Sequence, residues 1–93
     1  MNLEERIESF AELGRIIKES LEGTDAVHSG RFKKLIEKQQ YVNPWFTPEN
    51  VKMSLDSIAA NLTYEKLMEW TGRYPALEYM HDPSTIGIVM AGN

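Results

Sequence analysis

Apolar side chains recur every three or four positions near the start of the chain, the spacing that places them on one face of an α-helix. They are Leu3, Ile7, Phe10, Leu13, Ile17 and Leu21. Asn2 precedes this pattern as an N-cap, with Glu5 in the position that completes a capping box. Gly14 lies inside the pattern, where glycine costs about 1 kcal/mol, and Gly23 is suited to end the helix in a left-handed conformation.

Three further helices are predicted downstream. Helical spacing resumes at Phe32, after a possible cap at Ser29, and continues to about Tyr41. Asn43-Pro44 ends this second segment, because the residue before proline is disfavoured in the α region. Thr47-Pro48-Glu49 then begins a third helix, with threonine as N-cap and proline at the first helical position. Its apolar face is formed by Val51, Leu55, Ile58 and Leu62.

The fourth helix is short and leads into a different kind of sequence. It begins at Thr63 and ends at Gly72, and its apolar residues are Leu67, Met68 and Trp70. Residues 74–84 are predicted to form an irregular connection. Residues 85–90 form a continuous apolar, partly β-branched run, which is typical of a strand buried on both faces in a parallel sheet.

The pattern therefore predicts a mainly α protein, with four amphipathic helices followed by one C-terminal β-strand. We divide it into a helical region at 1–73, the connection at 74–84 and the strand segment at 85–93. Because one strand cannot form a sheet, this strand either pairs with another chain or begins a longer α/β protein. The sequence favours the second interpretation.

Composition removes several kinds of chemistry. The 93 residues amount to 10.7 kDa, enough for one small domain. They include no cysteine, which excludes disulfides, a thiolate nucleophile and cysteine-based metal sites. The two histidines, His28 and His81, lack the spacing of a metal-binding pair. We therefore predict no metal site.

The charge of the chain bears on its partners. The net charge is −4, and the excess of acids lies in residues 1–25. A local basic face on the second helix is formed by Arg31, Lys33, Lys34 and Lys38. The pI near 5.1 argues against nucleic acid as a partner, while contact with a phosphate-bearing small molecule stays open.

The sequence also bears on location. Glu4, Glu5 and Glu8 lie where a secretory signal would carry basic residues. The longest apolar stretch, at 86–91, is far shorter than the roughly 20 residues of a membrane-spanning helix. We expect a cytoplasmic protein without a membrane span.

Two local groups of residues have competing interpretations. In the run from Asn43 to Pro48, Trp45 and Phe46 are expected to fill the core at a rigid corner, and the alternative is an aromatic ligand platform. His81-Asp82 resembles a general base with its orienting carboxylate, but neighbouring residues in a turn flanked by proline rarely have that geometry. We therefore interpret His81 as a turn residue.

Three blocks together resemble the fatty acyl-CoA reductases of the bioluminescence type, a branch of the aldehyde dehydrogenase superfamily. They are Asn43-Pro44-Trp45-Phe46-Thr47, Asn61-Leu62-Thr63 and Gly87-Ile88-Val89-Met90-Ala91-Gly92-Asn93. The resemblance covers residues 31–93. Members of this family are several times longer, so it implies that the chain is the N-terminal piece of a reductase and that its strand begins a truncated α/β nucleotide-binding domain.

The resemblance implies a reaction as well. Such reductases transfer the acyl group of acyl-CoA to a cysteine as a thioester, and hydride from NADPH then releases an aldehyde. It identifies Asn93 as the amide donor of the oxyanion hole in the full-length parent. The residues expected to line the nicotinamide side of the cofactor cleft are Val89, Met90, Ala91 and Gly92. Because this chain has no cysteine, we expect it to be inactive alone. Because the resemblance implies that most of the cofactor site is missing, we also expect the isolated chain to bind no NADPH.

An alternative from a different class is a stand-alone helical interaction module without catalytic activity. The reductase interpretation predicts self-association through the C-terminal strand, since an unpaired apolar strand tends to pair with other chains. The module interpretation predicts a monodisperse species with a defined partner.

Overall fold

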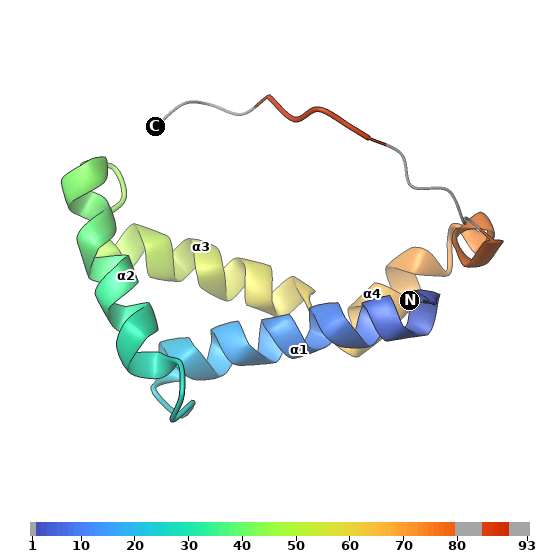
Figure 1. The fold of residues 1–93 in the computed structure, drawn as a ribbon, viewed down its shortest axis with the longest axis horizontal. Coiled ribbons are helices and arrows are strands. Elements are labelled where there is room, and N and C mark those ends of the chain that lie inside the picture. The colour runs from blue at the N-terminus through green and yellow to red at the C-terminus, as the bar shows by residue number, and fades with distance from the viewer. Residues whose placement is uncertain (1, 80–84, 90–93) are drawn as a thin grey trace.

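The structure, a computed structural model, describes residues 2–79 and 85–89. Within these ranges the chain is mainly α-helical and forms no β-strand. Its elements, shown in Figure 1, are α1 (Leu3–Glu22), α2 (Ser29–Val42), α3 (Pro48–Asn61), α4 (Tyr64–Thr71) and a short 3-10 helix, η1 (Pro75–Tyr79). The four predicted helices are therefore confirmed. Within the connection predicted to be irregular, at 74–84, residues 75–79 form the 3-10 helix η1, and residues 80–84 lie outside the described residues.

The helices form a flat layer organised around α1. In Figure 1, α3 and α4 follow one another along α1, while α2 crosses at the far end of the layer. Helix α1 packs against α2, α3 and α4, and α2 also packs against α3. The molecule measures 44 × 32 × 19 Å, and few apolar side chains of the described residues are buried in it.

Local signals set most helix ends as predicted. The side chain of Asn2 accepts a hydrogen bond from the amide of Glu5 at 2.8 Å. Thr47 and Thr63 cap α3 and α4 in the same way, and Pro48 begins α3. Gly23 ends α1 with a φ of 79° in the left-handed region. These caps satisfy backbone donors and acceptors that a helix leaves without partners at its ends.

The start of α2 differs from the prediction. Ser29 is the first residue of the helix, and its hydroxyl donates to the carbonyl of Asp25 instead of capping α2. The N-cap position is occupied by His28, whose side chain makes no capping bond. The carboxylate of Asp25 accepts the amides of Val27 and His28, so it organises the turn one step earlier. Asp25 takes this role because the short side chain of aspartate readily accepts hydrogen bonds from the amides two and three residues further along the chain.

The buried core is small. Among the described residues, the apolar side chains that are buried are those of Ile7, Ile36 and Ala59. The expectation that Trp45 fills the core is wrong, because 81% of its surface is exposed, whereas Phe46 is half-buried. The corner between α2 and α3 lies at the end of the thin layer, where no further element covers it.

The expected strand does not form in residues 85–89. This segment has no regular secondary structure, and Figure 1 shows it running apart from the helices. Ile86, Ile88 and Val89 are largely exposed. A β-strand needs a neighbour to accept its backbone hydrogen bonds, and the described part of the chain offers none. Among the described helices, none combines the length and apolar character required to span a bilayer.

Candidate functional site

The residues implicated by sequence do not form a site in the described part of the chain. Val89 lies in the extended segment, and its side chain is fully exposed. The other predicted site residues lie outside the described residues; they are Met90, Ala91, Gly92 and Asn93. No group of three or more acidic, histidine or cysteine side chains in the described ranges is placed to hold a metal ion. Cavities and polar contacts of the described residues gather instead at the α2–α3 corner, at the end near α4 and at the turn before α2.

The corner between α2 and α3 is built by two asparagines. The Asn43 side chain accepts the amide of Trp45 at 3.0 Å, and its carbonyl accepts the amide of Phe46 at 2.9 Å. From α3, the Asn50 side-chain amide donates to the carbonyl of Trp45 at 3.1 Å. The first block of the resemblance is therefore a turn closed by hydrogen bonds, and it holds the Trp45 backbone in place while the indole faces solvent.

An apolar groove of about 420 Å³ lies beside this corner. Its apolar lining comes from Trp45, Phe46, Val51 and Leu55. Tyr41 and Val42 at the end of α2 and Met53 on α3 are also large apolar side chains that are mostly exposed. Exposed apolar side chains in such number are typical of a surface that packs against another layer of protein.

The second block of the resemblance forms the junction of α3 and α4. Asn61 is the last residue of α3, and its side-chain amide donates to the carbonyl of Ser57 at 3.2 Å. Leu62 follows in close contact with Gly14 of α1, and Thr63 then caps α4. Both blocks thus have a local structural role in this chain, at the two ends of α3.

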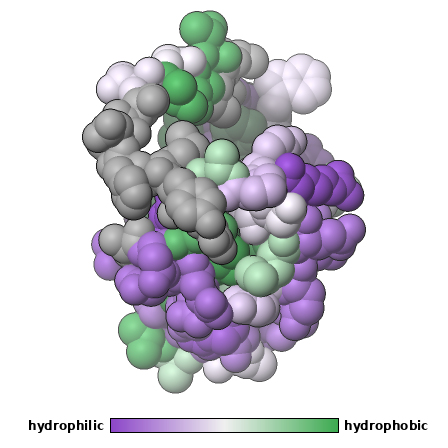
Figure 2. All heavy atoms as spheres, turned by 90° about the vertical axis from the view of Figure 1, so that its right-hand side faces the viewer, coloured by the Kyte–Doolittle hydropathy of each residue, from purple (hydrophilic) through white to green (hydrophobic). Residues whose placement is uncertain are grey.

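The opposite end of the layer is held by two contacts between α1 and the elements that follow α3. The Tyr64 hydroxyl donates to the Glu4 carboxylate at 2.9 Å, and this bond raises the pKa of Tyr64 above its usual range. Arg6 reaches the carbonyl of Leu77 at 3.4 Å. Figure 2 shows this end, where apolar side chains lie between polar ones on both sides. A cavity of about 300 Å³ opens there, lined in part by Ile7 and Met68.

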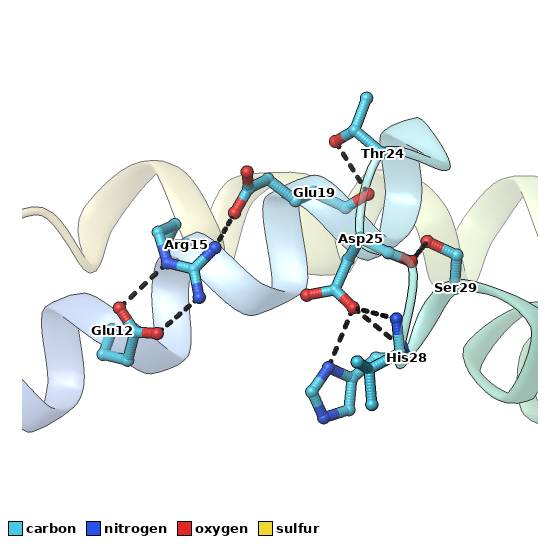
Figure 3. A network of polar contacts seen from close by, with 8 residues as sticks. Glu12, Arg15, Glu19, Thr24, Asp25, His28 and Ser29 are labelled. Carbon is cyan, nitrogen blue, oxygen red and sulfur yellow. Dashed lines mark hydrogen bonds and ion pairs between the residues drawn. The ribbon is translucent and has the colours of Figure 1, made fainter.

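Figure 3 shows a network of polar contacts along α1 and in the turn before α2. Asp25 accepts the amides of Val27 and His28, and its carboxylate lies 3.0 Å from Nδ1 of the His28 ring. These hydrogen bonds, with the His28 amide first, lower the pKa of Asp25. On the exposed side of α1, Arg15 forms ion pairs with Glu12 and Glu19. The hydrogen bond from Arg15 lowers the pKa of Glu12.

This network is structural rather than catalytic in form. A base is useful in catalysis when it can reach a substrate held in a pocket. The Asp25 carboxylate is instead committed to the backbone of its own turn, and its side chain is only 11% exposed. Sequence reasoning missed this role of Asp25, although an aspartate before a helix is a recognised capping signal.

Comparison with known proteins gave no family model, no curated protein and no solved structure that matches this chain. Inference about function therefore depends on the residue pattern and on the surfaces described above. These surfaces are apolar at the α2–α3 corner and along residues 85–89, and polar around the first turn of α2.

Proposed function

We propose that this chain is the helical N-terminal piece of an NADPH-dependent acyl-CoA reductase, and that it is inactive by itself. In the parent protein its helices cover one side of an α/β nucleotide-binding domain, and residues 85–93 form the first strand of that domain. The observation that carries this proposal is the low burial of apolar side chains in the helical layer. Its buried apolar side chains are few, while large ones such as Trp45 and Met53 face solvent.

The segment 85–89 supports the same proposal. Ile86, Ile88 and Val89 are exposed to 78%, 73% and 101%. Burial of each such side chain contributes about 1.5–3 kcal/mol, so an uncovered run of this kind is a strong driving force for pairing. A neighbouring strand would satisfy its backbone, and the helices on one face of the sheet would cover its side chains.

The catalytic contribution of the chain follows from the resemblance. Asn93 would donate its side-chain amide to the oxyanion that develops on the acyl thioester. Residues 89–92 would line the nicotinamide side of the cleft that holds NADPH, and a cysteine elsewhere in the parent would carry the acyl group. A donor aimed at a developing oxyanion is worth about 10²–10³ in kcat.

The test uses the full-length protein encoded by the reading frame that contains this chain. We expect the full protein to oxidise NADPH when given a fatty acyl-CoA, with formation of the aldehyde. Asn93→Ala should lower kcat by about 10²–10³ while the protein remains folded. Val27→Ala, an exposed change in the turn before α2, is the matched control and should leave kcat unchanged. A folded full-length protein without NADPH-dependent acyl-CoA reduction would rule the proposal out.

A stand-alone helical interaction module is the second candidate. It is favoured by one observation, the hydrogen-bonded corner that holds the Trp45 backbone in place while the side chain faces solvent. Exposed tryptophans anchored on a rigid turn are common centres of binding energy in interfaces. Size-exclusion chromatography with light scattering separates the two candidates: self-association of the 93-residue chain fits the reductase piece, and a stable monomer fits the module.

A further inference from the structure

The apolar groove at the α2–α3 corner, of about 420 Å³, has no charged side chain in its lining. Charged side chains do line two other cavities of the described residues. The cavity beside α4 includes Glu4, and one of about 350 Å³ between α1, α2 and α3 includes Lys33 and Lys52 together with Ser20. The corner groove is therefore suited to an apolar, uncharged occupant, because burial of a charge without a partner is costly.

Polar side chains in the lining of this groove have oxygen atoms that are free to accept hydrogen bonds. The side-chain amides of Gln39 and Asn50 each donate to a backbone carbonyl, at 3.0 and 3.1 Å. Their side-chain oxygens and the hydroxyl of Ser54 have no partner among the described residues. Apolar walls with acceptors between them suit an extended peptide, whose side chains gain apolar contact and whose amides need acceptors.

Residues 85–89 have the complementary properties. The segment carries no charge, and Ile86 and Ile88 are mostly exposed. Side chains two positions apart share one face of an extended backbone, so both can enter the same groove. A Cβ on Gly87, between them, would meet no atom within 4 Å, and glycine lets the backbone approach a wall closely. The amides of this segment form no hydrogen bond within the described part of the chain.

The segment follows η1, which lies at the opposite end of the layer from the corner (Figure 1). At that end Arg6 donates to the carbonyl of Leu77 at 3.4 Å. Nine positions lead from Leu77 to Ile86, and a fully extended chain of that length spans at most about 32 Å. The molecule is 44 Å long. The segment of one copy is therefore better placed to fill the groove of a second copy than to fill its own.

We propose that the 93-residue chain forms a dimer in which residues 85–89 of each copy lie in the corner groove of the other, with Ile86 and Ile88 against Trp45 and Leu55. Because each copy gives one segment and receives one, two-fold symmetry closes the assembly at two chains. The contact differs from the pairing of two strands, since the groove supplies the apolar walls and the acceptors.

The proposal concerns the 93-residue chain by itself and goes beyond the reductase assignment. In a full-length reductase the same segment would lie in the sheet and would not reach a second groove. Acyl-CoA reduction by the full-length protein tests the reductase assignment, whereas the mass of the 93-residue chain and of its variants tests the dimer contact.

The experiment measures this mass by size-exclusion chromatography with light scattering over a range of concentrations. We expect a dimer of about 21 kDa, twice the 10.7 kDa of one chain. Ile88→Asp in the segment and Trp45→Ala in the groove should each weaken dimerisation by about 10-fold or more. Val27→Asp and Trp70→Ala are the matched controls, at exposed positions outside the groove, and should leave the dimer intact. Circular dichroism checks that all four variants keep their helix content.

A mixture of the two disrupted variants tests the pairing of segment with groove directly. Ile88→Asp keeps an intact groove and Trp45→Ala keeps an intact segment, so one of the two contacts can still form between them. At a concentration where each variant alone is monomeric, the mixture should contain dimers. Neither strand pairing nor contact between two grooves predicts this result.

Other outcomes would overturn the proposal. A dimer that survives Trp45→Ala would show that two segments pair with each other. A mixture that stays monomeric would show that the groove does not receive the segment. An unmodified chain that is monomeric at every concentration would also contradict the dimer, and protection of the Ile86 and Ile88 amides from hydrogen exchange would then show that the segment fills the groove of its own copy.

Discussion

Gly14 of α1 and Leu62 at the end of α3 approach so closely that no side chain fits between them. A Cβ atom on Gly14 would lie 2.4 Å from the carbonyl oxygen of Leu62 and 2.6 Å from its Cβ. The backbones of the two helices therefore meet at this point. A glycine that weakens α1 as an isolated helix is required by the packing of α1 against α3.

Replacement of this glycine should separate the two helices. We expect Gly14→Ala to lower the free energy of unfolding by about 1–3 kcal/mol, since overpacking outweighs the gain of about 1 kcal/mol in helix propensity. Chemical denaturation measures the change. Gly30→Ala is the matched control, because a Cβ there meets no atom within 4 Å. This control should be neutral or stabilising, and an equal loss in both variants would contradict the packing explanation.

A second glycine is required by backbone conformation alone. Gly23 has a φ of 79°, and a Cβ there would meet nothing within 4 Å. Gly23→Ala should therefore destabilise the chain by about 1–2 kcal/mol through strain in the left-handed region. Gly23→Asn should cost less, because asparagine tolerates this conformation better. Thermal melts of the two variants would show this order, and the reverse order would exclude conformational strain as the cause.

The cap of α4 offers a test of local stability. Thr63 accepts the amide of Lys66 at 3.3 Å, and α4 has only eight residues. Thr63→Ala should cost about 0.5–2 kcal/mol, with loss of helical signal from α4 before the other helices. Ser54→Ala, at an exposed position inside α3, serves as the control and should change stability by less than about 0.5 kcal/mol.

Stability should also depend on the ionisation of Asp25. Its folded-state pKa is lowered, first by the hydrogen bond from the His28 amide, so the charged form stabilises the turn. This contribution is complete above the usual pKa of about 4 and is lost as the pH falls through the lower folded-state value. Asp25→Asn should therefore be less stable than the unmodified chain at pH 7.

The difference in free energy of unfolding between Asp25→Asn and the unmodified chain should become smaller in acid. Denaturation curves at pH 7 and below pH 3 would measure it, and His28→Ala provides a control because it removes the ring contact but keeps the backbone bonds to Asp25. A difference that stays constant with pH would show that the carboxylate charge does not stabilise the turn.

Sequence reasoning was most successful where the signal is local. The periodic apolar positions, the caps at Asn2, Thr47 and Thr63 and the stop at Gly23 all have their predicted roles. A cap depends on residues three positions apart, so no knowledge of the tertiary structure is needed to identify it.

Predictions that required knowledge of distant contacts were less successful. An apolar pattern identifies which face of a helix is suited to burial, but it does not tell how much of that face finds a partner; Phe10 and Leu13 of α1 are exposed for this reason. The strand predicted from residue 85 onward does not form in the described part, 85–89, because pairing needs a second strand. The cavity lined by Ser20 was not foreseen, because it depends on how α1, α2 and α3 pack together.

The central position of α1 has a consequence for how the chain opens. Helix α1 packs against all three other helices, whereas α4 packs mainly against α1 and is tied to it by the Tyr64–Glu4 bond. Loss of that one contact area releases α4 without disturbing α2 or α3. Amide hydrogens of α4 should therefore exchange with deuterium through local opening, while those in the middle of α1 exchange only when the whole layer comes apart.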